Sequence, residues 1–278
     1  MSGLPLPTSE LRDLCVGYVR AAGALAREGR VAARTAAEST LGELTKSTAT
    51  DLVTEFDRAA ERVIVAAIRA DRPDDTIIGE EGADHPGTSG LEWHVDPIDG
   101  TTNFVYDLPT WACSVGVAYG GVGVAGAVYA PMLDELYAAS IEADGRGTAT
   151  LNGRAIAPST VTDPALALVA TGFAYRADTR VAQARRIAHL AGDVRDFRRF
   201  GAASYDLCLV ASGRVDAYYE SGLNSWDMVA GDVICRAAGA RTSDWSGGPV
   251  RPAELLAAAP GLHDALLALL ARAAANGV

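Results

Sequence analysis

The stretch from Trp93 to Phe104, with the sequence WHVDPIDGTTNF, places the tightest constraint on how the chain folds. Pro97 lacks a backbone N–H and holds Asp96 in an extended conformation, so the stretch cannot form an ordinary helix. The residues before Asp96 predict a strand that ends there, and Asp99-Gly100 is typical of a tight turn. Both carboxylates are therefore expected to face one small volume.

Length and composition narrow the class of protein. At 278 residues the chain can bury a large core, as one domain over residues 1–278 or with two subdomains at about 1–150 and 151–278. The net charge of -11 disfavours nucleic acid and anionic membranes as partners. No apolar run reaches the roughly 20 residues that span a bilayer. Residues 1–7 lack the pattern of a signal peptide, so a cytoplasmic location is expected.

The positions of the cysteines indicate neither a metal site nor a set of disulfides. Cys15, Cys113, Cys208 and Cys235 are scattered in apolar contexts, without a Cys-x-x-Cys spacing. Buried free thiols are therefore expected, rather than a zinc site or a disulfide framework.

Helical and strand-like segments alternate without an internal repeat, which predicts an α/β sandwich. Apolar periodicity predicts helices at about 9–28, 51–68, 178–191, 201–210, 226–238 and 261–274. Strands are predicted at 76–78, 112–119, 122–130, 135–141, 165–170 and 215–220. The three strands between 112 and 141 are expected to form an antiparallel meander. Residues 29–50 predict a mobile loop that contains Lys46.

Acidic residues stand at the ends of several predicted segments: Asp57, Glu80 with Glu81, Asp96 with Asp99, Glu220, and Asp227. Each has an ordinary explanation, because acids commonly cap helices or occupy turns. Most of them, however, lie beside apolar segments, where an uncompensated carboxylate is costly to bury. Clustered carboxylates repel one another unless a cation neutralises them. Oxygen ligands favour magnesium before calcium or manganese.

Bound metal ions would also let an acidic protein accept an anionic phosphate ester, because they reverse the local sign of the charge. The backbone N–H groups of Gly100 and Thr101, at a helix start, would hold the phosphate. This combination predicts metal-assisted phosphoester hydrolysis.

Three motifs resemble the metal-binding motifs of the inositol monophosphatase family: Gly79-Glu80-Glu81, residues 93–104, and Trp226-Asp227-x-x-Ala230-Gly231. The resemblance extends to Lys46, to Asp51-Leu52-Val53-Thr54 with Asp57, and to residues 201–220, so it covers most of residues 45–240. The order and spacing of the motifs are specific. The family implies a layered α/β/α/β sandwich, usually a homodimer, that requires magnesium and is typically inhibited by lithium.

The resemblance implies a first metal ion held by Glu80, Asp96, the Ile98 carbonyl and Thr101, and a second held by Asp96, Asp99 and Asp227. Glu80 with water would hold a weaker third, so two or three Mg²⁺ ions are implied. A water on the first metal, activated by Glu80 and Thr101, would be the nucleophile. Asp57 would orient the Thr101 hydroxyl, and the second metal would stabilise the leaving alkoxide.

The resemblance also implies the substrate contacts. Gly100 and Thr101 would bind the phosphate, and the alcohol side would be formed by Asp99, the Ala203 backbone, Glu220 and Asp227. Lys46 would close over the site from its loop. Where the family often has Gly-Thr-Ala-Ala or Gly-Ser-Ala-Ala, this chain has Gly201-Ala202-Ala203-Ser204, which removes one hydroxyl from that position.

The expected function is hydrolysis of myo-inositol monophosphate to myo-inositol and phosphate, and Glu220 motivates the choice of inositol. Histidinol phosphate, nucleotide 3′-phosphates and sugar bisphosphates are alternative substrates, because related enzymes use the same metal motifs. A binding or regulatory protein that has kept the fold and lost the reaction is the alternative from another class. The presence of Glu80, Asp99 and Asp227 favours the enzyme. The expected partners are a small phosphorylated polyol and a second copy of the chain.

Overall fold

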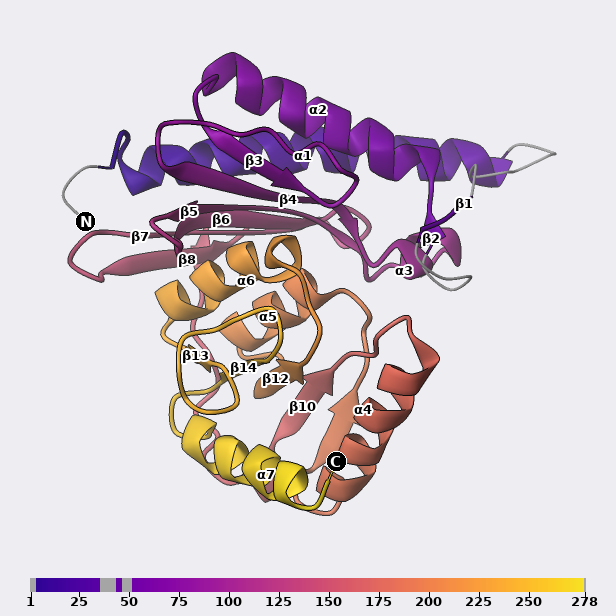
Figure 1. Cartoon of the computed structure of the whole chain (residues 1–278), viewed down its shortest axis with the longest axis vertical. Coiled ribbons are helices and arrows are strands. Elements are labelled where there is room, and N and C mark those ends of the chain that lie inside the picture. The colour runs from indigo at the N-terminus through magenta and orange to yellow at the C-terminus, as the bar shows by residue number, and fades with distance from the viewer. Residues whose placement is uncertain (1–3, 36–43, 47–51, 278) are drawn as a thin grey trace.

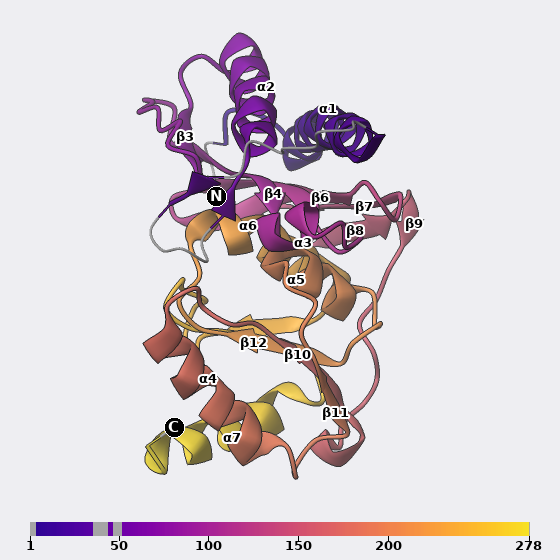
Figure 2. The same ribbon diagram turned by 90° about the vertical axis from the view of Figure 1, so that its right-hand side faces the viewer.

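The described residues of the computed structural model, 4–35, 44–46 and 52–277, are arranged in five layers that alternate helices and sheets (Figures 1 and 2). Helices α1 (Thr8–Thr35) and α2 (Glu55–Asp71) form the outermost layer above the larger sheet. Helices α5 (Ala203–Ala211) and α6 (Ser225–Ala238) lie between the two large sheets. The predicted α/β/α/β order is confirmed, and a fifth layer of helices follows the second sheet.

The larger sheet contains the predicted meander. Within the described residues its strands follow the order β3 (Thr76–Gly79), β4 (Leu91–Asp99), β5 (Ala112–Tyr119), β6 (Val122–Ala130), β7 (Glu135–Ile141), β8 (Gly147–Leu151) and β9 (Arg154–Ala155). β3 pairs with β4 in parallel, and the later neighbours are antiparallel. Apolar side chains on one face form a buried core under α1 and α2, with Trp93, Val115 and Ala127 among its members.

Strand β4 does not end at Asp96, as the sequence predicts, but continues to Asp99. Asp96 is opposite Ser114 and Asp99 is opposite Ala112, so β4 has one residue more than β5 between these pairs. Such a bulge accommodates Pro97, which has no N–H to give to the ladder. The strand therefore carries both acids before the chain turns.

The second sheet follows the order β11 (Asp196–Arg198), β10 (Leu168–Thr171), β12 (Ala217–Glu220), β14 (Leu255–Ala258) and β13 (Arg241–Ser243). β10 lies parallel to β11 and β12. The strand predicted at 165–170 begins instead with a 3-10 turn at Pro164–Leu166, because Asp163 caps that turn. Helices α4 (Ala177–Leu190) and α7 (His263–Ala275) cover the outer face, as expected for the last helix.

Two expectations near the N-terminus are wrong. Helix α1 continues past Gly29 to Thr35, because the segment is rich in Ala and Arg, which favour helix. The second helix begins at Glu55, because Leu52–Val53 forms strand β2 and pairs with β1 (Leu44–Thr45). The rest of the expected loop, residues 36–43 and 47–50, and the proposed helix start at Asp51 lie outside the described residues.

The cysteine prediction is confirmed, because the four thiols are buried and form no disulfide. Within the described segments, no helix is both long enough and apolar enough to cross a bilayer.

Helix α6 lies close against the larger sheet at two paired glycines. Gly116 and Gly126 are opposite one another in β5 and β6. A Cβ added to Gly126 would lie 2.8 Å from the Ala230 Cα, and one added to Gly116 would lie 2.6 Å from the Ala230 nitrogen. Because backbone cannot move aside as a side chain can, these glycines set the distance between sheet and helix.

We expect Gly126→Ala to lower the free energy of unfolding by about 1–3 kcal/mol, because its methyl group overpacks against α6. Gly17→Ala is the control: within the described structure no heavy atom lies within 4 Å of a Cβ added there. In helix α1 that change should stabilise the protein by about 0.5–1 kcal/mol. Urea denaturation measures both. An equal effect of the two substitutions would contradict the close packing.

Candidate active site

The bulge in β4 brings two acids to the face of the sheet that meets α5 and α6. Asp96 is 1% exposed and Asp99 is 7% exposed. Oδ1 of Asp96 accepts a hydrogen bond from the Ile98 N–H at 3.1 Å, which closes the irregular segment around Pro97. The irregular backbone of this segment thus follows from the pair Asp96-Pro97.

Gly100 turns the chain from β4 into the short helix α3 (Thr101–Val105). Its φ of 89° lies in the left-handed region, which glycine adopts without strain. A Cβ there would also lie 3.0 Å from the Gly201 carbonyl oxygen. Among the described residues no side chain caps α3, so the N–H groups of its first turn have no side-chain acceptor. Gly100 and Thr101 line a cavity.

The Thr101 hydroxyl lies 3.0 Å from Asp57 Oδ1 and 3.1 Å from the Ile98 carbonyl oxygen, both within hydrogen-bonding distance. Asp57 is held in turn by a capping box with Thr54, whose N–H and hydroxyl both donate to Oδ2. The capping explanation of Asp57 and its contact with Thr101 are therefore both correct. One carboxylate starts helix α2 and fixes the threonine.

Asp99 joins the larger sheet to helix α5. Its carboxylate accepts hydrogen bonds from the Ala203 N–H at 3.2 Å, the Ser204 N–H at 2.7 Å and the Ser204 hydroxyl at 2.6 Å. Ala202, the N-cap of α5, has no capping oxygen, so Asp99 takes that role from another element. The hydroxyl missing from position 202 has a counterpart at Ser204, which donates to Asp99 and is therefore not free for a substrate.

Glu80 follows strand β3 and is paired with Lys46. The Lys46 ammonium lies 2.8 Å from Glu80 Oε1 and 2.6 Å from Glu81 Oε1. The Glu81 N–H donates to Glu61 Oε1 at 2.9 Å, which anchors this segment on helix α2. The expected position of Lys46 over the acids is therefore seen in the structure.

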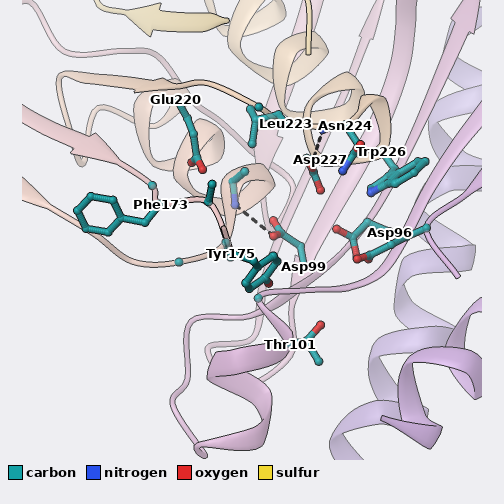
Figure 3. Close-up of a pocket in the computed structure, with 18 of the residues that line it drawn as sticks. Asp96, Asp99, Thr101, Phe173, Tyr175, Glu220, Leu223, Asn224, Trp226 and Asp227 are labelled. Atoms are coloured by element: carbon teal, nitrogen blue, oxygen red, sulfur yellow. Dashed lines mark hydrogen bonds between the residues drawn. The ribbon is translucent and has the colours of Figure 1, made fainter. Parts of the chain in front are cut away.

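Asp227 stands in the first turn of α6 and completes a capping box with Asn224, whose N–H donates to Asp227 Oδ2 at 2.6 Å. The helix-cap explanation of Asp227 is therefore also correct. The carboxyl groups of Asp96, Asp99 and Asp227 are turned toward one another in Figure 3. They line one cavity of about 380 Å³ together with Glu80 and Thr101.

Burial and mutual repulsion dominate the electrostatics of these acids. Burial, and then the charge of Glu80, raises the pKa of Asp96 well above its ordinary range. Burial also raises the pKa of Asp227, with Asp99 as the next cause. The pKa of Asp99 rises only to about 6, because Ser204 and Ala203 donate to it. Deprotonating the whole set at neutral pH therefore requires added positive charge.

The acids suit a hard divalent cation in type and in charge, since they present oxygen donors in a buried negative site. As they stand, no three Asp, Glu, His or Cys side chains among the described residues surround a single point. The reason is visible in their contacts: Lys46 holds Glu80, α5 holds Asp99, and Asn224 holds Asp227. A divalent cation held by these carboxylates would supply the positive charge that offsets their mutual repulsion.

The same cavity is also lined by Glu220 and by Phe173, Tyr175 and Leu223. Glu220 ends strand β12 as predicted, and its Oε2 accepts a hydrogen bond from the Tyr218 hydroxyl at 2.5 Å. All the expected site residues thus border this cavity, except Asp57, which lies behind Thr101.

Several contributing residues were missed from the sequence. Tyr218 precedes Glu220 by two residues, so strand alternation places both on one face. Glu61 follows Asp57 by four residues and shares its helix face. Ser204 at the start of α5 was recognised only as part of a variant motif. The approach of Gly172 to Glu220 has no local sequence signal, because the two residues follow or end different strands.

Stability should depend on pH through Glu220, which burial holds at a pKa of about 7. In the unfolded chain a glutamate ionises near pH 4.3, so its stabilising contribution is complete below that pH and is lost as pH rises through 7. As pH rises from 5 to 8, the free energy of unfolding should therefore fall less in Glu220→Gln than in the wild type. The difference should reach up to about 3 kcal/mol.

Urea denaturation at several pH values, in chelator, measures this difference. Glu10→Gln, at an exposed position of α1, is the control and should follow the wild type. Parallel curves for Glu220→Gln and the wild type would contradict the prediction.

Comparison with known proteins agrees with this geometry. The model of the inositol monophosphatase family matches residues 8–276. Inositol-1-monophosphatase SuhB of Mycobacterium tuberculosis is 42% identical over 235 residues, covering 82% of this chain and 80% of the relative. Nus factor SuhB of Escherichia coli is 41% identical over 208 residues, 74% of this chain and 76% of the relative.

Among solved structures, the extragenic suppressor protein suhB of Bartonella henselae superposes with a TM-score of 0.84 at 30% identity. The match covers 94% of this chain and 98% of that one. These matches span the motifs and the layers described above. The chain belongs to the inositol monophosphatase family and is a phosphatase.

Proposed function

We propose that the protein is a magnesium-dependent phosphomonoesterase whose preferred substrate is a myo-inositol monophosphate. The observation that carries this proposal is the shared cavity, in which Asp96, Asp99 and Asp227 face the uncapped start of helix α3. The family membership supports phosphate monoester hydrolysis, and the M. tuberculosis relative is named for inositol 1-phosphate.

The residues that would hold two or three Mg²⁺ ions are Glu80, Asp96, the Ile98 carbonyl, Asp99, Thr101 and Asp227. Each offers oxygen, the donor that Mg²⁺ prefers, and most are buried. When bound, the metal would supply a Lewis acid for the phosphate and lower the pKa of a coordinated water. The mutual repulsion of the acids that line the cavity favours such binding.

Around the phosphate, the chain contributes position and hydrogen bonds. The N–H groups of Gly100 and Thr101 would donate to the phosphate oxygens. Asp57 keeps the Thr101 hydroxyl oriented, and Thr54 fixes Asp57 through its second oxygen. Glu80 would accept the proton of the attacking water.

At the alcohol end, Glu220 and Asp99 would accept hydrogen bonds from ring hydroxyls. The Ala203 N–H already donates to Asp99. Its proposed contact with the substrate therefore requires that the same N–H donate to a substrate oxygen as well. An alcohol rich in hydroxyl groups matches the free oxygen of Glu220, which supports the inositol choice. Cytoplasmic location, homodimer formation and inhibition by lithium belong to the same proposal.

The proposal is tested by phosphate release from purified protein with magnesium. We expect kcat/KM for inositol 1-phosphate to exceed that for histidinol phosphate by roughly tenfold or more, because a lost hydrogen bond to a charged group costs about that factor. A higher value for histidinol phosphate would overturn the inositol choice. Absence of hydrolysis of both esters, and of 3′-nucleotides and sugar bisphosphates, would support the binding-protein alternative.

Asp99→Asn should reduce kcat by more than about a hundredfold, because it removes a charged metal ligand while the amide oxygen can still cap α5. Asp144→Asn, in the turn after β7, is the matched control and should keep wild-type turnover. Circular dichroism checks the fold of both variants. Retention of activity by Asp99→Asn at saturating magnesium would contradict the assigned role.

A further inference from the structure

A hydrogen bond that the proposed mechanism does not use joins the strand that carries Asp96 to the helix that carries Asp227. His94 lies in β4, two residues before Asp96, so the two side chains are on the same face of the strand. Ser225 is the first residue of α6, two residues before Asp227. His94 Nδ1 lies 2.9 Å from Ser225 Oγ, within hydrogen-bonding distance. Each partner therefore stands two residues from an acid of the site.

A second, weaker contact joins the same turn of α6 to the neighbouring strand. Ser114 in β5 is opposite Asp96 and is fully buried. Its hydroxyl donates a long hydrogen bond of 3.4 Å to the Trp226 carbonyl oxygen. The two contacts thus hold successive residues of α6, immediately before Asp227. Because hydrogen bonds have preferred directions, a pair of them restricts both sliding and rotation of the turn.

The close packing of α6 on the sheet does not by itself fix this turn. Gly116 is opposite His94, and a Cβ added to it would lie 2.6 Å from the Ala230 nitrogen. That contact sets how near the helix comes to the sheet. Apolar contact has no preferred direction, so it leaves open where the first turn stands along β4. The hydrogen bonds supply that information.

His94 and Ser225 are not among the residues expected to touch metal or substrate. They line a separate cavity of about 450 Å³, and within the described structure no residue lines both this cavity and the one that contains the acids. His94 is 6% exposed, whereas Ser225 is half-buried. An effect of either side chain on the metal would therefore have to act through the position of β4 and α6.

We propose that His94 is a positioning residue, whose hydrogen bond with Ser225 fixes the start of α6 on β4. The bond thereby sets the separation of Asp96 and Asp227, the two carboxylates that would share one Mg²⁺ ion. Metal affinity would then depend on a contact outside the metal site, as it does where groups that orient metal ligands are replaced. The inference rests on the proposed function, because it assumes that the two aspartates hold the same ion.

The test is a calorimetric titration of the purified protein with Mg²⁺ in the absence of substrate, with hydrolysis of inositol 1-phosphate measured in parallel. His94→Leu and Ser225→Ala should each weaken Mg²⁺ binding roughly tenfold, the effect of losing a group that orients a metal ligand. The double variant should bind no more weakly than either single variant, because the same bond is lost in all three. At saturating magnesium kcat should stay near the wild-type value, since excess metal fills the site.

Two further variants separate the hydrogen bond from general stability. His94→Asn keeps an amide that can bond to Ser225 and should bind Mg²⁺ nearly as the wild type does. Thr242→Val is the matched control, because it removes a hydrogen bond of 2.7 Å from the Thr242 hydroxyl to Asp232, farther along the same helix. It should leave Mg²⁺ affinity unchanged, whatever its effect on the melting temperature. If His94→Leu does not fold, Ser225→Ala at its half-buried position still decides the inference.

Wild-type affinity for Mg²⁺ in the folded His94→Leu and Ser225→Ala variants would overturn the positioning role. A loss in His94→Asn or Thr242→Val as large as in His94→Leu would also overturn it, because packing or general destabilisation would then be the cause. Failure of the proposed function looks different: the wild-type protein binds magnesium but hydrolyses no phosphate ester, and the titration still decides the positioning role. A wild-type protein that binds no magnesium would overturn both.

Discussion

The contact between Asp99 and the first turn of α5 connects the two ends of the site. Asp99 belongs to the larger sheet, whereas Ala203 and Ser204 begin a helix that packs on the second sheet. Charge-assisted hydrogen bonds of this kind are among the stronger polar contacts in proteins, and this one is buried. It sets where strand β12, and with it Glu220, stands relative to Asp96. The proposed metal end and alcohol end therefore share one carboxylate.

The arrangement also explains how a buried site can hold so many acids. Each acid has a second task in the fold: Asp57 and Asp227 close capping boxes, and Asp99 caps α5. The backbone donors that these helix starts supply partly compensate the carboxylates before any cation binds. The structural explanation of these residues is therefore compatible with the proposed functional one, and weighing one against the other in the sequence undervalued their combination.

Much of the fold follows from local sequence. The meander from β5 to β7 matches its predicted ranges, because Gly120-Gly121 and Pro131 separate apolar runs that are typical of strands. The sequence motifs also predicted that the acidic residues stand at the ends of helices and strands. The bulge between Asp96 and Asp99 was not foreseen, because it depends on pairing with β5. Helix α1 was cut short at Gly29, where the neighbouring helix formers outweigh one glycine.

Contacts between segments that are far apart in the sequence were not predicted from it. Gly172 and Glu220 meet only because β10 and β12 are neighbours in the second sheet. The order of segments has a further consequence for synthesis on the ribosome. The larger sheet is complete by Ala155, but α6, which fits against Gly116 and Gly126, begins only at Ser225. Until then one apolar face of a finished sheet stays uncovered, so the nascent chain passes through a stage prone to aggregation.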